Sequence, residues 1–468
     1  MNIMSYRGPA AAGGVSTALA RIIQNSLDEN QYWWHMDSST LQRRNPQEAT
    51  KEAMTCFSPD IVSGHYRYCN GFLWPLLHDL PQYAKFDLSA HFDYLTFNKE
   101  VADSILRNPH ESIEEYFVND YQLALVPGLL CKSFASKVIV FWHIPWPRSV
   151  SPQFVPLLSE IARGLLGARR IGFHTDEYCE NFMNFVAEHL LSYTVDFATR
   201  SICFSHSVSR PTELCALPLG LDVGFWKQAA ASASIRHEKL DLSGKISGRF
   251  ILSVDRADYT KGVLERLNAI DEYFAKHLHR RGELTFIQVC QPTRMGLAIF
   301  DHYWQLCRQR CDEINARWGA GDWQPIQWLD KPVPLSVLSW LYRNTDAMLI
   351  NPVRDGLNLT AKEFIVCSHE GALILSRGAG VWQEVGEYAL TLDDLSPQAI
   401  GEQVERALNL PALERQLYIY RMKKIVETND LETWWHKLSA GERSPRDSLN
   451  LATSLAQCWV DKQLELSK

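Results

Sequence analysis

The sequence predicts an α/β protein with two parallel-sheet domains that face each other across a cleft. Short apolar runs alternate with longer stretches of helical periodicity, which is the pattern of a parallel sheet covered by helices. The length of 468 residues suits two or three domains at ~100–200 residues each. A segment poor in bulky apolar side chains, 228–247, divides the chain near its middle and is predicted to connect the two halves.

The second half shows the alternation most clearly. Strands are predicted where short buried runs occur, at residues 250–254, 284–289, 326–329, 347–350 and 372–375. Helices are predicted between them, at 261–276, 297–317, 335–343 and from about 359 onward. In such sheets the ligand binds beyond the carboxyl ends of the strands, so the residues that follow each strand are the candidates for a site.

The first half follows the same pattern less regularly. Strands are predicted at 138–141, 171–173 and 202–204, and helices near 153–166 and 177–191. No sequence repeat is visible at a fixed period.

Composition excludes several classes of protein. Hydrophobic residues make up 46% and aromatic residues 11% of the chain, which rules out disorder for most of it. The 47 basic and 54 acidic residues give a net charge of −7 without a block of one sign, so neither a nucleic acid nor a membrane surface is a predicted partner.

Cysteine usage and the absence of a signal sequence favour a cytoplasmic location. The 11 cysteines are scattered through apolar stretches, as expected for reduced, buried thiols. No apolar stretch approaches the ~18 residues that span a bilayer. Cys307 and Cys311 share one face of a predicted helix, but no further ligands complete the set that a structural zinc requires, so no metal is predicted.

The segment 253–262 carries two cations where a strand ends and a helix begins. Arg256 and Lys261 flank this transition, beside the amides of a helix N-terminus. A diphosphate would be held there by charge-assisted hydrogen bonds and by the helix dipole. The alternative interpretation is two surface cations paired with Asp255 and Asp258.

The segment 351–363 repeats the order of strand, polar turn and helix. Asp355 and Asn358 suit hydrogen bonds to sugar hydroxyls, and the amides of Asn358 and Leu359 suit a phosphate. Glu363, one turn into the helix, suits the two hydroxyls of a ribose. An ordinary Asp-Gly turn with an asparagine cap would explain Asp355 and Asn358, but not the whole run.

Two further positions are candidates. His143 follows a buried strand in a loop that two prolines stiffen; the alternative is a core histidine whose hydrogen bonds are satisfied. Arg7 and the pair Gly13 and Gly14 precede a predicted helix, and paired glycines allow a backbone to approach an anion closely.

Several common motifs are absent from the sequence. Residues 378–380 lack the third glycine of a dinucleotide fingerprint, and no Walker or Gly-x-Ser-x-Gly motif occurs. No Asp-x-Asp pair is present to hold a divalent cation on a sugar nucleotide. We therefore predict no cofactor, and neutralisation of a leaving diphosphate is assigned to Arg256 and Lys261.

Taken together, these segments resemble glycosyltransferase family 20, the trehalose-6-phosphate synthase family. The runs that carry the resemblance occur in family order and are Gly13-Gly14, Asn70-Gly71-Phe72-Leu73-Trp74-Pro75, Asp120-Tyr121, His143-Ile144-Pro145, Gly172-Phe173-His174-Thr175, Arg256 to Gly262 and Arg354 to Glu363.

The resemblance implies a GT-B fold with two Rossmann-like domains. By this comparison, residues 1–228 form the acceptor-binding domain and 229–430 the nucleotide-sugar-binding domain. Residues 431–468 form a helical segment that crosses back to the first domain.

The resemblance also implies which residues bind each substrate. On the donor side these are Arg256, Lys261 and Gly14 at the diphosphate, His143 and Asp355 at the glucose, the amides of Asn358 and Leu359, and Glu363 at the ribose. On the acceptor side they are Arg7, Tyr121 and Arg294 at the phosphate, and Trp74 and Asp120 at the sugar. His65 occupies an acceptor position where the family usually has a tyrosine.

The departures from the family pattern cluster on the acceptor side. Besides His65, residues 119–122 read Asn-Asp-Tyr-Gln where His-Asp-Tyr-His is common, and His174 stands at a frequent glutamine. The loop from Arg7 to Gly13 also looks shorter than usual.

The reaction that the resemblance implies is a retaining, metal-independent glucosyl transfer. The donor is a nucleoside diphosphate glucose with UDP, GDP or ADP, and the acceptor is a phosphorylated sugar or polyol. Glucose 6-phosphate is the first acceptor considered. Attack occurs on the front face, and a donor phosphate oxygen takes the proton of the acceptor.

Three alternatives accompany this interpretation. The altered acceptor residues are compatible with glycerol 3-phosphate, which would give glucosylglycerol phosphate. A pseudo-glycosyltransferase coupling cyclitols and a catalytically silent sugar-phosphate-binding protein are the others; a fold can outlast its chemistry. A homo-oligomer is compatible with the sequence.

Overall fold

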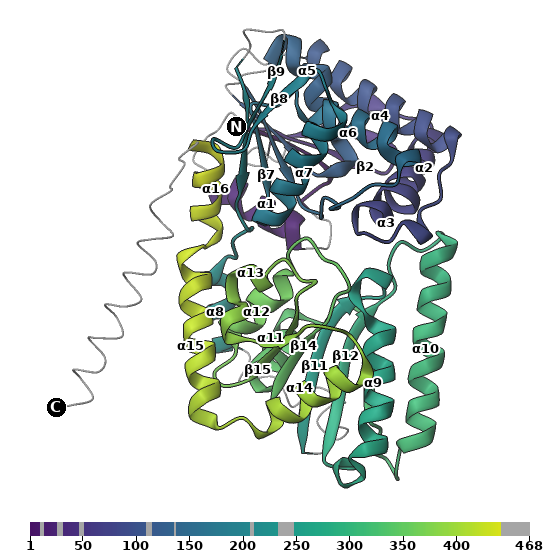
Figure 1. Ribbon diagram of the computed structural model, residues 1–468, viewed down its shortest axis with the longest axis vertical. Coiled ribbons are helices and arrows are strands. Elements are labelled where there is room, and N and C mark those ends of the chain that lie inside the picture. The colour runs from purple at the N-terminus through teal and green to yellow at the C-terminus, as the bar shows by residue number, and fades with distance from the viewer. Residues whose placement is uncertain are drawn as a thin grey trace, which may run out of the picture.

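A computed structural model describes residues 1–9, 14–25, 31–45, 51–108, 115–134, 137–205, 210–232 and 248–440. The chain forms two lobes, each built on a sheet, with the helices packed around both sheets (Figure 1). Among the described residues, no helix is long and apolar enough to cross a membrane.

The sheet of the first lobe has the strand order β4-β3-β2-β1-β5-β6-β7-β10-β9-β8. Its strands are β1 (Asn2–Arg7), β2 (Trp33–Asp37), β3 (Thr40–Arg44), β4 (Lys51–Cys56), β5 (Tyr116–Asn119), β6 (Val138–Trp142), β7 (Arg170–Phe173), β8 (Tyr193–Asp196), β9 (Ser201–Phe204) and β10 (Thr212–Ala216). The central strands β1, β5, β6 and β7 pair in parallel, and β5, β6 and β7 are buried along their whole length.

Three helices of the first lobe begin at ordinary capping residues. The helices of this lobe are α1 (Gly14–Asn25), α2 (Pro59–Arg67), α3 (Trp74–Leu77), α4 (Leu88–Arg107), α5 (Val126–Phe134), α6 (Val155–Leu165) and α7 (Asp176–His189). The side chains of Ser58, Asp87 and Thr175 accept hydrogen bonds from the first backbone amides of α2, α4 and α7.

The sheet of the second lobe has the order β13-β12-β11-β14-β15-β16, and every pairing in it is parallel. Its strands are β11 (Arg249–Arg256), β12 (Leu284–Gln291), β13 (Ile326–Leu329), β14 (Ala347–Ile350), β15 (Ala372–Ser376) and β16 (Leu390–Leu392). The helices of this lobe are α8 (Val223–Ser232), α9 (Val263–Lys276), α10 (Ala298–Trp318), α11 (Leu335–Asn344), α12 (Leu359–Cys367), α13 (Trp382–Val385), α14 (Pro397–Asn409) and α15 (Ala412–Thr428). The last helix, α16 (Leu431–Ala440), lies against the first lobe.

The chain passes between the lobes twice, and the two passages lie against each other. Leu221 forms a β-bridge with Asp430, and the amide of Leu431 donates to the carbonyl of Leu221 over 3.1 Å. A Cβ on Gly220 would lie 2.0 Å from the carbonyl oxygen of Asp430, so only glycine allows this approach. Helices α15 and α16 follow along one side of both lobes (Figure 1), and α16 packs on α1.

The predicted fold class is confirmed, with one correction in the first lobe. Its sheet is mixed, because β3 and β4 pair antiparallel at one edge and β8 and β9 at the other. The strand at 202–204 is therefore part of an antiparallel hairpin. Of the predicted connection 228–247, residues 228–232 belong to α8, and 233–247 lie outside the described residues.

Candidate active site

Arg256 is the last residue of β11, and a tight turn follows it. Asp258 accepts hydrogen bonds from the backbone N and the Oγ1 of Thr260, at 3.1 and 3.0 Å. Gly262 has φ +66°, and a Cβ there would lie 2.2 Å from the carbonyl oxygen of Asn351. Glycine is therefore required at this position, and α9 begins at the next residue.

Asp258 binds Arg294 rather than either of the cations beside it in the sequence. Arg294 Nη1 lies 2.5 Å from Asp258 Oδ2, and both side chains are buried. Asp255 pairs instead with Arg266 over 3.0 Å, and Lys261 with Asp355 over 2.5 Å. The alternative in which Asp255 and Asp258 neutralise Arg256 and Lys261 at the surface is therefore wrong.

Arg294 joins the two lobes. Its Nε donates to Asn70 Oδ1 over 2.7 Å, and its guanidinium lies 3.8 Å from the centroid of the Trp74 ring. Trp74 Nε1 in turn donates to Asp258 over 3.4 Å. Asn70 and Trp74 reach this point because a π-helical turn, Tyr68–Leu73, leads into α3. Such turns are often found at functional sites.

Arg256 lies in a strongly positive environment. Its side chain has accessible surface, but the surrounding protein desolvates it. This desolvation, and then the charges of Arg294 and Arg7, lower the pKa of Arg256, while Asp258 and Asp355 oppose them. Three cations from both lobes thus share one field, which an anionic ligand would relieve.

Lys261 and Asp355 form a largely buried pair at the turn before α12. Their side chains are only 11% and 13% exposed. Asn358 Nδ2 donates to the same carboxylate over 3.1 Å, while its Oδ1 caps α12 by accepting from the amide of Ala361 over 3.2 Å. Asn358 has φ +86°, a strained value for a residue with a side chain.

Glu363 lies on α12, with its carboxylate held by one hydrogen bond. Tyr342 OH donates to Glu363 Oε2 over 2.9 Å. Burial raises the pKa of Glu363 to about 7, against the weaker opposing effect of the tyrosine. The carboxyl retains unfilled acceptor capacity, which suits hydroxyl donors.

The N-termini of two helices from different lobes meet at Gly14 and Leu359. Gly14 begins α1 and Leu359 begins α12, and a Cβ on Gly14 would lie 2.6 Å from Leu359 Cδ1. Both helices therefore direct their free amides toward the same region. Gly13 lies outside the described residues.

His143 and Asp120 follow the neighbouring strands β6 and β5. The amide of His143 donates to Asp120 Oδ1 over 3.1 Å, and Asp120 has φ +71°. Burial raises the pKa of Asp120 to about 7. The carbonyl of His143 touches the other lobe, since a Cβ on Gly356 would lie 1.9 Å from it.

Tyr121 and Arg7 complete the acceptor set. Tyr121 is buried, and its hydroxyl donates to Asn70 Oδ1 over 3.2 Å. Its pKa is raised, by burial above all. Arg7 ends β1, exposed, and its charge acts on Arg256.

His65 is enclosed by aromatic rings rather than open to a ligand. Its side chain is fully buried, its ring stacks on Tyr6 and Tyr94, and the Phe97 ring lies 3.9 Å away. Its Nε2 lies 2.9 Å from the carbonyl of Gln122. The structure therefore places His65 in an aromatic cluster against Tyr6, the residue before Arg7.

Two neighbours of the site were missed at the sequence level. The sequence indicates Asp258 only as a partner of the cations beside it. His78, four residues after Trp74, donates Nδ1–H to the Trp74 carbonyl over 2.7 Å, and its ring packs 4.0 Å from the Trp74 ring. The spacing of four on a helix was the signal that could have found His78.

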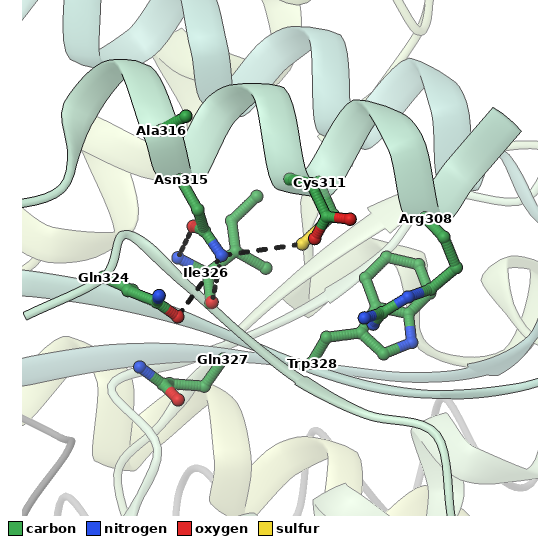
Figure 2. Close-up of a pocket in the computed structure, with 9 residues that line it drawn as sticks. Arg308, Cys311, Asn315, Ala316, Gln324, Ile326, Gln327 and Trp328 are labelled. Atoms are coloured by element: carbon green, nitrogen blue, oxygen red, sulfur yellow. Dashed lines mark hydrogen bonds between the residues drawn. The ribbon is translucent and has the colours of Figure 1, made fainter.

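A separate cavity of about 410 Å³ lies between α10 and β13 (Figure 2). Asn315, one of its polar lining residues, is already paired within the protein, because it donates to the carbonyl of Ile326 and accepts from its amide, both over 3.0 Å. Cys311 lies against the same asparagine. None of the expected site residues lines it.

In the part of the chain that the structure describes, no group of three His, Cys, Asp or Glu side chains is arranged to hold a metal ion. Cationic side chains, helix N-termini and neutral hydrogen-bonding groups from both lobes meet instead. This combination suits a ligand with phosphate groups and hydroxyls.

Comparison with known proteins identifies similar sequences along the whole site. A model of glycosyltransferase family 20 matches residues 12–441. A bifunctional trehalose-6-phosphate synthase/phosphatase of Thermoproteus tenax is 31% identical over 385 residues, which cover 81% of this chain and 51% of that protein. The chain thus spans about half the length of this relative.

A UDP-forming α,α-trehalose-phosphate synthase of Zygosaccharomyces rouxii is 27% identical over 93% of this chain and 91% of its own length. Among solved structures, one of the same named activity from Burkholderia xenovorans, in complex with glucose-6-phosphate, has a TM-score of 0.84 at 25% identity. That match covers 94% of this chain and 99% of the other.

Proposed function

The chain belongs to glycosyltransferase family 20, and we propose that it transfers a glucosyl group from UDP-glucose to glucose 6-phosphate. The observation that carries the proposal is the meeting of Arg256 with Arg294 and Trp74 where the lobes touch, close to the pair of Lys261 and Asp355. The relatives named for UDP-forming trehalose-phosphate synthesis support the choice of both substrates.

The donor is assigned to the second lobe. Arg256 and Lys261 bind the diphosphate, together with the amides at the N-termini of α1 and α12. When the donor binds, Lys261 would leave Asp355 and contact a phosphate oxygen. Asp355 would then accept a hydrogen bond from a hydroxyl of the glucose. Glu363, with open acceptor positions, binds the ribose hydroxyls.

The acceptor is assigned to the first lobe and Arg294. Arg7, Tyr121 and Arg294 hold its phosphate, and Trp74 and Asp120 contact its sugar. His65, fully buried, supports this surface through Tyr6 and does not reach the ligand.

The transfer breaks the bond between the anomeric carbon and the β-phosphate oxygen, and forms a bond from that carbon to the acceptor hydroxyl. Negative charge grows on the diphosphate as the bond breaks, and Arg256 and Lys261 stabilise it more in the transition state than in the ground state. We assign the proton of the acceptor hydroxyl to a phosphate oxygen of the leaving group. The acceptor attacks from the face that the diphosphate leaves, so the configuration of the anomeric carbon is retained. No metal is required.

A donor-by-acceptor matrix tests the proposal. UDP-, GDP- and ADP-glucose are each combined with glucose 6-phosphate, glycerol 3-phosphate and no acceptor, with nucleotide release measured and the product identified. We expect UDP release and trehalose 6-phosphate. Persistence of activity in EDTA tests the metal-independent step.

Glycerol 3-phosphate is the second candidate acceptor. It is favoured by the burial of His65, which removes one polar group from the acceptor surface. Turnover with glycerol 3-phosphate alone would establish this alternative. Binding of UDP-glucose without turnover on any acceptor would indicate a silent sugar-nucleotide-binding protein.

A further inference from the structure

Two buried histidines, His143 and His174, lie side by side at the carboxyl ends of adjacent strands. The parallel register of β6 and β7 pairs Trp142 with Phe173, so each histidine is the next residue of its chain. His143 Nδ1 lies 3.2 Å from His174 Nε2. Both side chains are less than 10% exposed.

The two rings belong to a longer chain of hydrogen bonds. At one end, the backbone N of Leu219 lies 3.3 Å from His174 Nδ1. At the other end, His143 Nε2 lies 2.8 Å from Asn119 Oδ1. Asn119 is the last residue of β5, and Leu219 lies where the chain leaves the first lobe.

The donor and the acceptor of every hydrogen bond in this chain follow from the bond between the Leu219 amide and His174. A backbone N–H can only donate, so Nδ1 of His174 must accept and carries no proton. A neutral His174 then has its proton on Nε2, which faces His143. Nδ1 of His143 must accept it, and the proton of a neutral His143 resides on Nε2, where it donates to Asn119.

We propose that His174 is a positioning residue, which holds His143 as the neutral tautomer protonated on Nε2. The proposal rests on the assignment of His143 to the donor glucose. It explains how a histidine beside a diphosphate site stays uncharged and correctly oriented, and it leaves His143 no free nitrogen with which to act as a base.

The surroundings oppose a charge on either ring. Burial lowers the pKa of His143 to about 3 and holds that of His174 well below its ordinary value. Lys362 adds a positive charge near His174 and is itself paired with Glu384. Asp120 accepts a hydrogen bond from the backbone amide of His143. A proton added to either ring would make two N–H groups face each other, at the contact between the rings or at the contact of His174 with the Leu219 amide.

Two substitutions at position 174 separate the proposed role from packing. In His174→Gln, the amide oxygen can accept from Leu219 and the amide nitrogen can donate to His143, so the pattern is kept. In His174→Glu, an ionised carboxylate only accepts. His143 must then place a proton on Nδ1, either as an imidazolium or as the opposite neutral tautomer with the Asn119 amide turned.

Nitrogen-15 NMR of the full chain labelled in histidine reads the tautomer directly. We expect His143 to be neutral and protonated on Nε2 in the wild type and in His174→Gln from pH 5.5 to 8. In His174→Glu, we expect a proton on Nδ1 of His143. Asp120 can titrate in the same pH range, which is why the ring of His143 is observed rather than activity alone.

Kinetics provide the second measurement. His174→Gln should keep kcat within about threefold, while His174→Glu should lose about tenfold or more in kcat, with a smaller change in KM. The same state of His143 in both variants, or a cationic His143 in the wild type, would overturn the proposal. Absence of glucosyl transfer by the wild type with every acceptor would refute the proposed function, and the NMR comparison would still decide the role of His174.

Discussion

Asp258 shows how much one side chain can organise. Its carboxylate is completely buried and accepts from Arg294, Trp74 and Thr260, which come from both lobes. Burial by itself would raise its pKa, but the positive charges around it, Arg294 foremost, produce a net lowering. The residue stays ionised and holds Arg294 beside Trp74, and its charge also acts on Arg256.

Substitution of Arg256 by alanine should reduce kcat by about 100-fold or more, comparable to the loss of an oxyanion-hole donor. The charge that develops on the leaving diphosphate would lose a stabilising partner. Steady-state rates of UDP release check this. Arg308→Ala is a matched control, because that guanidinium lies over Trp304 and Trp328 beside the outer cavity. Near-normal turnover of Arg256→Ala would contradict the assigned mechanism.

Glu363 should make stability fall as the pH rises. Its pKa is raised from 4.5 to about 7 in the folded chain, so the stabilisation present below pH 4.5 is lost as the pH passes through 7. The loss is at most about 3 kcal/mol. Urea unfolding of wild type and Glu363→Gln at several pH values measures it.

The difference in unfolding free energy between Glu363→Gln and the wild type should shift in favour of the variant between pH 4.5 and 7. Asp120 contributes with the same sign in both proteins and cancels in the difference. A difference that does not change with pH would show that the folded and unfolded carboxyls titrate alike.

At the scale of elements, the lobes touch closely at a position that glycine occupies. A Cβ on Gly356, in the turn before α12, would lie 1.9 Å from the carbonyl oxygen of His143, so only glycine fits at this position. Gly14 of α1 also meets α12, but there the nearest atom is Cδ1 of the flexible Leu359 side chain. Backbone cannot withdraw as a flexible side chain can, so the contact of Gly356 with His143 fixes how closely the two lobes approach at this point.

Gly356→Ala should therefore cost about 1–3 kcal/mol of stability and at least tenfold in kcat/KM, as overpacking displaces His143. Gly401→Ala in α14 is the control, since its Cβ would meet Tyr273 Cδ2 at an ordinary 3.8 Å. That change should be neutral or stabilise by up to ~1 kcal/mol, because alanine is the better helix former. Equal activity and stability of the two variants would contradict the close contact.

At the scale of the whole molecule, Lys362 connects the passages between the lobes to the site. Its fully buried ammonium donates to the carbonyl of Leu219 over 2.9 Å and pairs with Glu384 over 2.7 Å. Glu384 also accepts from Asn429, at the second passage, over 3.2 Å. The buried ion pair between Lys362 of α12 and Glu384 of α13 thus contacts both passages of the chain between the lobes.

Lys362→Met should destabilise the protein by about 3–5 kcal/mol, since Glu384 would be left nearly buried without a counter-charge. The double variant Lys362→Met with Glu384→Gln should recover a substantial part of that loss. Unfolding in urea at pH 7 measures the cycle. Additive effects of the two substitutions would mean that the pair does not interact.

Much of the site was predictable because it follows from local order along the chain. Arg256 ends a buried strand, Lys261, Asp355 and Asn358 follow one, and parallel strands bring such residues to one edge. The π-helical turn was not predictable, and neither were the antiparallel edges of the first sheet, because short strands paired over long distances carry little periodic signal.

The sequence by itself determined the two α/β lobes, the polar turns that close their strands and the cations within those turns, because periodicity and strand ends are local properties. Only the tertiary structure decided which charges pair. Asp258 meets Arg294 and Lys261 meets Asp355 through contacts between distant segments, and His65 is enclosed by rings from β1 and α4. Charge pairing and burial depend on distances in space, which spacing along the chain does not encode.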